Sequence, residues 1–102
     1  RWGDLNRAFH MTLYRASNLP FHLGTLSNAM DRLDRYVRAQ LLLTEGHARA
    51  HAEHLEILDA CARGDADAAA ELTAAHIRRA HAMLREHLTK IQAAFGTASE
   101  TA

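Results

Sequence analysis

Helix-breaking residues are scarce in this chain, and this scarcity constrains the fold more than any other feature. The 102 residues include one proline and five glycines, the two residue types that interrupt helices most strongly. Alanine, leucine and arginine, which all favour helix, dominate the composition, whereas aromatic residues make up only 6%. The sequence therefore predicts an all-α fold, and its length allows one domain with a single core.

Apolar residues recur at three- and four-residue spacing in four segments, as expected for amphipathic helices. The predicted helices cover about residues 4–16, 21–43, 48–62 and 66–95. Asp4 and Asp65 are the predicted N-caps of the first and the fourth helix. Asn18 and Gly64 are suited to the left-handed conformation that ends a helix.

Short connections between long helices favour antiparallel neighbours. We therefore expect an antiparallel helical bundle over residues 1–95, followed by a disordered tail at 96–102 of small and polar residues. The outer face of the second predicted helix is expected to be polar and solvated. It carries Asp31, Arg32, Asp34, Arg35 and Arg38.

The charge balance and the single cysteine limit the possible partners and compartments. Lys plus Arg and Asp plus Glu number 12 each, so no basic surface predicts DNA binding by this segment itself. No apolar run approaches the roughly 18 residues that span a bilayer. Cys61 has no second cysteine for an internal disulfide, which fits a reducing compartment. We expect a cytoplasmic protein without a membrane span.

Three histidines lie on or beside the apolar stripes of three different predicted helices: His10, His54 and His76. An unsatisfied buried polar group costs on the order of 1–3 kcal/mol, so each imidazole needs a partner. Taken singly, such a histidine is more often hydrogen-bonded in a core than bound to metal. A shared metal ion would satisfy all three, because neutral imidazole is the commonest metal ligand in proteins. Asn6 lies one helical turn before His10 and could reach the same ion.

Two alternative sites remain open from the residues alone. His47, His51 and His54 form one stripe on a single helix and could bind a divalent ion by themselves. A catalytic site is less well supported, because no general base or phosphate loop can be identified. Glu53 and His54 are adjacent, which does not match the Glu-x-x-His pairs of di-iron bundles.

An ordered set of motifs resembles a known family. The motifs are Asn6-Arg-Ala-Phe-His10, Ala16-Ser-Asn18, Glu53-His-Leu-Glu-Ile-Leu-Asp-Ala60, Gly64-Asp-Ala-Asp-Ala-Ala69 and His76-Ile77. In order and spacing they resemble the FCD ligand-binding domain of the FadR subfamily of GntR-type bacterial transcription regulators. The resemblance covers roughly residues 3–90 and implies an all-helical bundle.

The resemblance also implies a metal site and partners. In the metal-binding members, an Asp-or-Asn-x3-His pair and two further histidines hold the ion, which correspond here to Asn6, His10, His54 and His76. A small carboxylate effector then completes the coordination. The resemblance implies a homodimer and an N-terminal winged helix-turn-helix, which is absent here, so we expect the chain to be a C-terminal portion. Asn6 replaces the more usual Asp, which leaves more positive charge on the ion for an anionic effector.

The leading hypothesis is an effector-sensing domain that binds Zn²⁺ or Ni²⁺, the ions that imidazole ligands favour. Arg35 or Arg32 would add a charge-assisted hydrogen bond to the effector carboxylate. The competing interpretation of both arginines is a solvated face ion-paired with Asp31 and Asp34. The alternative functions are a helical dimerisation module without metal and a metal-dependent enzyme.

Overall fold

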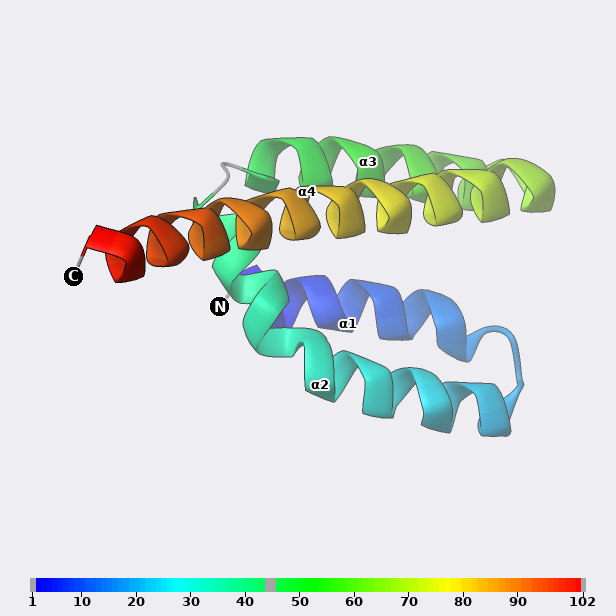
Figure 1. The fold of residues 1–102 in the computed structure, drawn as a ribbon. Coiled ribbons are helices and arrows are strands. Elements are labelled where there is room, and N and C mark those ends of the chain that lie inside the picture. The colour runs from blue at the N-terminus through cyan, green and yellow to red at the C-terminus, as the bar shows by residue number, and fades with distance from the viewer. Residues whose placement is uncertain (1, 44–45, 102) are drawn as a thin grey trace. The chain divides into compact units, whose positions relative to one another are not determined.

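The computed structural model describes residues 2–43 and 46–101, which form four α-helices (Figure 1). The helices are α1 (Trp2–Arg15), α2 (Pro20–Leu43), α3 (Gly46–Ala62) and α4 (Ala66–Thr101). These two ranges contain no strand, so the predicted all-α class is confirmed. The chain divides into two compact units, residues 1–39 and 40–102. The first contains an antiparallel pair of α1 and α2, and the second an antiparallel pair of α3 and α4.

The turn between α1 and α2 follows the prediction closely. Asn18 has a φ of 55°, the left-handed conformation that an asparagine tolerates better than most residues. The Ser17 N–H donates a hydrogen bond to the Tyr14 carbonyl oxygen at 3.0 Å, which closes the end of α1. Pro20 begins α2, where its missing N–H costs no helical hydrogen bond.

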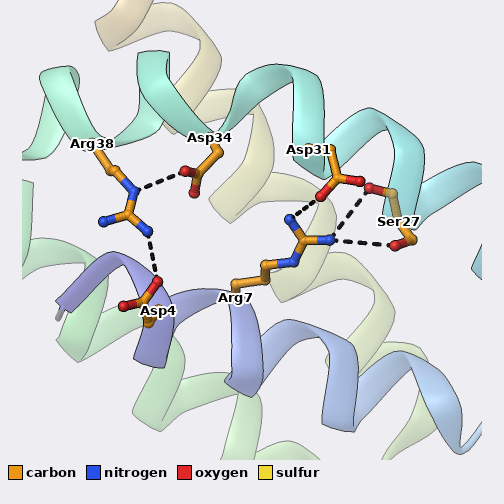
Figure 2. Close-up of polar contacts among 6 residues, drawn as sticks. All are labelled: Asp4, Arg7, Ser27, Asp31, Asp34 and Arg38. Atoms are coloured by element: carbon orange, nitrogen blue, oxygen red, sulfur yellow. Dashed lines mark hydrogen bonds and ion pairs between the residues drawn. The ribbon is translucent and has the colours of Figure 1, made fainter.

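Two arginines connect α1 and α2 through polar contacts (Figure 2). Arg7 on α1 donates to Asp31 at 2.5 Å and to the Ser27 hydroxyl at 3.3 Å. Arg38 on α2 donates to Asp34 at 2.8 Å and to Asp4 at 2.6 Å.

These contacts correct two expectations. Asp4 is not an N-cap, because α1 begins at Trp2 and the Asp4 carboxylate accepts a hydrogen bond from Arg38. That bond lowers the pKa of Asp4. Part of the polar face of α2 is also directed to α1, since Asp31 pairs with Arg7. Gly3 fits the same arrangement, because a Cβ there would come within 3.2 Å of the Arg38 side chain.

In the second unit, α3 and α4 pack along a narrow stripe of small and branched residues. Ile57 is completely buried, and Ala50 and Ala60 are buried on the same face of α3. Alanines at such positions let two helices approach closely. Three polar residues are buried as well: Glu53, His54 and His76.

The turn between α3 and α4 is a Schellman motif. Gly64 has a φ of 72°, and its N–H donates to the Cys61 carbonyl oxygen at 3.0 Å. The Asp65 N–H donates to the Ala60 carbonyl oxygen at 3.0 Å, which completes the motif. Asp65 Oδ1 also accepts a bond from the Ala68 N–H at 3.1 Å. The predicted roles of Gly64 and Asp65 are therefore confirmed.

Helix α4 continues to Thr101, although the sequence pattern predicted its end near Phe95. A single glycine, Gly96, costs only about 1 kcal/mol in a helix interior, and no proline or capping motif follows it. None of the helices in the described ranges is long and apolar enough to cross a membrane.

Candidate metal centre

Helices α3 and α4 bring two buried imidazoles together. His54 lies on the buried stripe of α3, four residues after Ala50 and three before Ile57. His76 lies on α4 and is 7% exposed, against 9% for His54. Their Nε2 atoms are 3.1 Å apart, and the rings meet edge to face at 67°. Two residues 22 positions apart thus direct the same ring nitrogen at each other.

A buried carboxylate holds the other nitrogen of His76. The Nδ1–H of His76 donates to Glu53 Oε1 at 2.9 Å, and Glu53 is only 6% exposed. Arg49 donates to the same oxygen at 3.3 Å, and Arg79 donates to Oε2. The charge of Glu53 is thereby compensated from both helices.

The surroundings keep Glu53 ionised. Burial raises the pKa of this carboxyl group, because desolvation disfavours the charged form. The hydrogen bonds from His76 and Arg79 lower it, as do the positive charges of Arg49 and Arg79. Together, the hydrogen bonds and positive charges outweigh the effect of burial, so the pKa of Glu53 lies below its ordinary value.

The surroundings keep His54 neutral. The pKa of His54 is lowered from 6.5 to about 4, mainly by burial and also by the nearby His76 and His51, against an opposing effect of Glu53. His54 therefore carries a lone pair near neutral pH and down to about pH 5. A lone pair on the imidazole is the form that binds a metal ion.

The proton positions follow from these contacts. In neutral His76, Nδ1 carries the proton that bonds to Glu53, so Nε2 is an acceptor. The proton between the two Nε2 atoms then belongs to His54. Binding of a metal ion at Nε2 of His54 would therefore require the other neutral form of this ring, with the proton on Nδ1.

The geometry of the pair fits a metal ion. Zinc–nitrogen bonds of about 2.0–2.1 Å place two nitrogens on the same ion roughly 2.8–3.4 Å apart, for angles from right-angled to tetrahedral. The observed separation of 3.1 Å lies within that interval. The second unit thus contains two candidate metal ligands, His54 and His76, and a buried carboxylate bonded to one of them, an arrangement of the kind that orients metal-binding histidines.

The first unit contains the other two predicted ligands, Asn6 and His10. They are four residues apart on α1, so they lie on one face of that helix. His10 is buried at 7% exposure, and its Nδ1 lies 3.3 Å from the Tyr14 hydroxyl. Burial raises the pKa of Tyr14, which keeps the phenol protonated. With His54 and His76, the described part of the chain buries three histidines that could bind a metal.

The arginines proposed as effector ligands lie on α2. Arg32 and Arg35 are both exposed, and the Arg35 guanidinium lies 5.2 Å from the ring centre of Tyr36. Their expected ionic partners are engaged elsewhere, since Asp31 bonds to Arg7 and Asp34 bonds to Arg38. An effector-binding role for the two arginines stays a prediction.

The alternative stripe on α3 places its three histidines in different surroundings. His51 is exposed and His47 is half-buried, whereas the buried His54 has its ring directed at His76 on α4. His54 therefore has an imidazole partner on another helix, at hydrogen-bond distance.

Sequence reasoning missed Glu53, Arg49 and Arg79. Adjacent helical residues point about 100° apart, so Glu53 was set aside as a partner for the site of His54. The structure shows that this angle lets the two neighbours contact opposite nitrogens of one His76 ring. Arg49 could have been found from its position one turn before Glu53.

Comparison with known proteins identifies one family. The sequence model of the FCD domain matches residues 1–90, which is most of the chain. FCD domains are effector-binding regulatory domains of GntR-type transcription regulators and not enzymes. No curated protein and no solved structure gives a significant match to the chain.

Proposed function

Because the chain belongs to the FCD domain family, we propose that it senses a small carboxylate effector through a bound divalent metal ion. The observation that carries this proposal is the buried pair of His54 and His76, whose Nε2 atoms are separated as two ligands of one ion would be.

We propose Asn6, His10, His54 and His76 as the metal ligands. The imidazoles favour Zn²⁺ or Ni²⁺ over harder ions such as Mg²⁺. The low pKa of His54 supports this assignment, because the ring competes for metal with few protons near neutral pH. When bound, the ion would supply positive charge and open coordination positions for an anionic effector.

The effector would be a small organic carboxylate. Asn6 is a neutral ligand, so it leaves the charge of a divalent ion uncompensated and favours an anion beside it. Arg35 or Arg32 would donate a charge-assisted hydrogen bond to that carboxylate. Both side chains are exposed.

The signal would pass to DNA through a separate winged helix-turn-helix domain of a homodimeric, cytoplasmic regulator. This chain has equal numbers of basic and acidic residues, which supports a sensing role and not a DNA-binding one. Effector binding would favour one arrangement of the domain and thereby change the DNA affinity of its partner domain.

Metal titration tests the proposal. The purified protein, stripped with chelator, is titrated with Zn²⁺ and Ni²⁺ by isothermal calorimetry, in parallel with His54→Ala and the exposed control His81→Ala. We expect one site per chain in the wild type and the control, and a large loss of affinity in His54→Ala. Equal affinity in all three proteins would refute the site, and a wild type without binding would favour a metal-free dimerisation module.

A small-molecule screen then tests the effector class. Thermal unfolding is followed with a panel of small mono- and dicarboxylates, with Zn²⁺ present and with chelator. Stabilisation by a carboxylate only in the presence of the metal would support the proposal, because a ligand that binds the folded state raises its stability. Stabilisation that is equal with chelator would contradict metal-dependent sensing.

A further inference from the structure

Among the residues whose burial is described, Glu53 is the one buried carboxylate, and it lies at the histidine pair without being one of the proposed metal ligands. It is 6% exposed and lies immediately before His54 on α3. A buried carboxylate is costly unless donors surround it. The structure supplies three donors, from His76, Arg49 and Arg79.

We propose that Glu53 is a positioning residue for the metal centre, which holds the proton of His76 on Nδ1 and so keeps Nε2 of that ring as the metal-binding nitrogen. The inference rests on the proposed function for its metal, but the contact on which it depends lies wholly within α3 and α4. A neutral imidazole has one proton and two nitrogens, so a strong acceptor at one nitrogen decides which nitrogen has the lone pair.

The geometry restricts the ring as well as its proton. Glu53 Oε1 is 2.9 Å from Nδ1 of His76, and His54 Nε2 is 3.1 Å from Nε2 of the same ring. Rotation of the ring by half a turn would place Cδ2 at the position of Nδ1 and Cε1 at the position of Nε2, so the lone pair would no longer be directed at His54. The hydrogen bond to Glu53 opposes this rotation.

Two arginines fix the carboxylate itself. Arg49 lies one turn before Glu53 on α3 and bonds to Oε1, while Arg79 on α4 bonds to Oε2. Both oxygens are therefore engaged, and the carboxylate plane is set from two helices. Arg49 is about one-third exposed and Arg79 about one-half, so their charged groups keep contact with solvent while they compensate the buried charge.

The test compares Glu53→Ala and Glu53→Gln with Glu56→Ala, which removes a charge from an exposed position of the same helix. Nitrogen-15 NMR of the histidine rings is recorded in chelator to assign the protonated nitrogen of His76. Zn²⁺ affinity is measured by calorimetry on the same proteins. Circular dichroism establishes that each variant is folded.

We expect wild type and Glu56→Ala to have the proton of His76 on Nδ1 and equal Zn²⁺ affinity. Glu53→Ala should lose that preference and bind Zn²⁺ about 10- to 100-fold more weakly, the usual effect of removing an outer partner of a metal-binding histidine. Glu53→Gln retains an acceptor oxygen and should show a smaller loss and a displaced Nδ1 proton signal.

A folded Glu53→Ala protein with wild-type ring protonation and affinity would overturn the inference. If that variant does not fold, an unchanged Nδ1 signal and unchanged affinity in Glu53→Gln would overturn it instead. A wild type that binds no Zn²⁺ would overturn the proposed function, and the spectra in chelator would then decide the role of Glu53 on their own.

Discussion

The low pKa of His54 predicts a specific loss of stability in mild acid. In the folded protein this pKa is about 4, whereas an exposed histidine has a pKa of 6.5. Between these values the unfolded chain binds a proton at His54 that the folded chain does not. Stability from this residue is therefore fully present above pH 6.5 and is lost as the pH falls towards 4.

The size of the loss follows from the two pKa values. Each pKa unit corresponds to about 1.4 kcal/mol, so proton linkage at His54 gives a loss of about 2 kcal/mol between pH 7 and pH 5. Because His54 is only 9% exposed, solvent screens little of this effect. The ionised Glu53 adds its own loss only at lower pH, since its pKa is lowered below the ordinary value of 4.5.

Urea unfolding at pH 7, 6 and 5 in the presence of chelator measures this effect. The wild type is compared with His54→Gln, which cannot gain a proton at that position, and with His81→Gln, which removes an exposed histidine of α4. We expect the stability advantage of the wild type over His54→Gln to shrink by about 2 kcal/mol from pH 7 to pH 5. The advantage over His81→Gln should stay nearly constant.

A parallel decline would refute the reasoning. If the free energies of unfolding of the wild type and His54→Gln fall together, within about 0.5 kcal/mol, then His54 is not kept neutral by its surroundings. The description of His54 as a neutral imidazole would then be wrong.

Two further predictions concern the helix pair and its turns. Ile57→Ala should destabilise the protein by about 2–5 kcal/mol, because it leaves a cavity in a fully buried position. Leu58→Ala, at an exposed position, should cost much less. Chemical denaturation measures both variants, and equal losses of stability would contradict the assigned core. Gly64→Ala should destabilise the protein by about 1–2 kcal/mol, because the residue has a positive φ. Gly24→Ala lies within α2, where an added Cβ would meet open space, and should stabilise the protein by about 0.5–1 kcal/mol. A loss of stability at Gly24 as large as that at Gly64 would contradict the conformational argument.

Local sequence signals predicted the helices well. Asn18, Gly64 and Asp65 each act within a few residues of the chain, so their identities alone locate the two turns. The predicted end of α4 near Phe95 was wrong, because a single glycine, Gly96, without a capping residue beside it does not end a helix reliably. Asp4 was misassigned because its partner, Arg38, is 34 residues away, and no local pattern reports such a contact.

The histidine pair was predictable only in part. The apolar stripes placed His54 and His76 towards the interior, and both are buried. The contacts of His76 involve Glu53 on α3, which in turn accepts a hydrogen bond from Arg79 on α4. Helical periodicity describes one helix at a time, so it cannot report which side chains of two helices meet.

The engagement of both nitrogens of His76 has a consequence for the alignment of α3 and α4. A shift of α4 by one residue along α3 would bring Ala75 or Ile77 to the place of His76, and neither side chain can donate to Glu53. The loss of a hydrogen bond to a charged group costs about 1.5–3 kcal/mol. Alanine-rich packing alone would tolerate several alignments, so a single imidazole selects one of them.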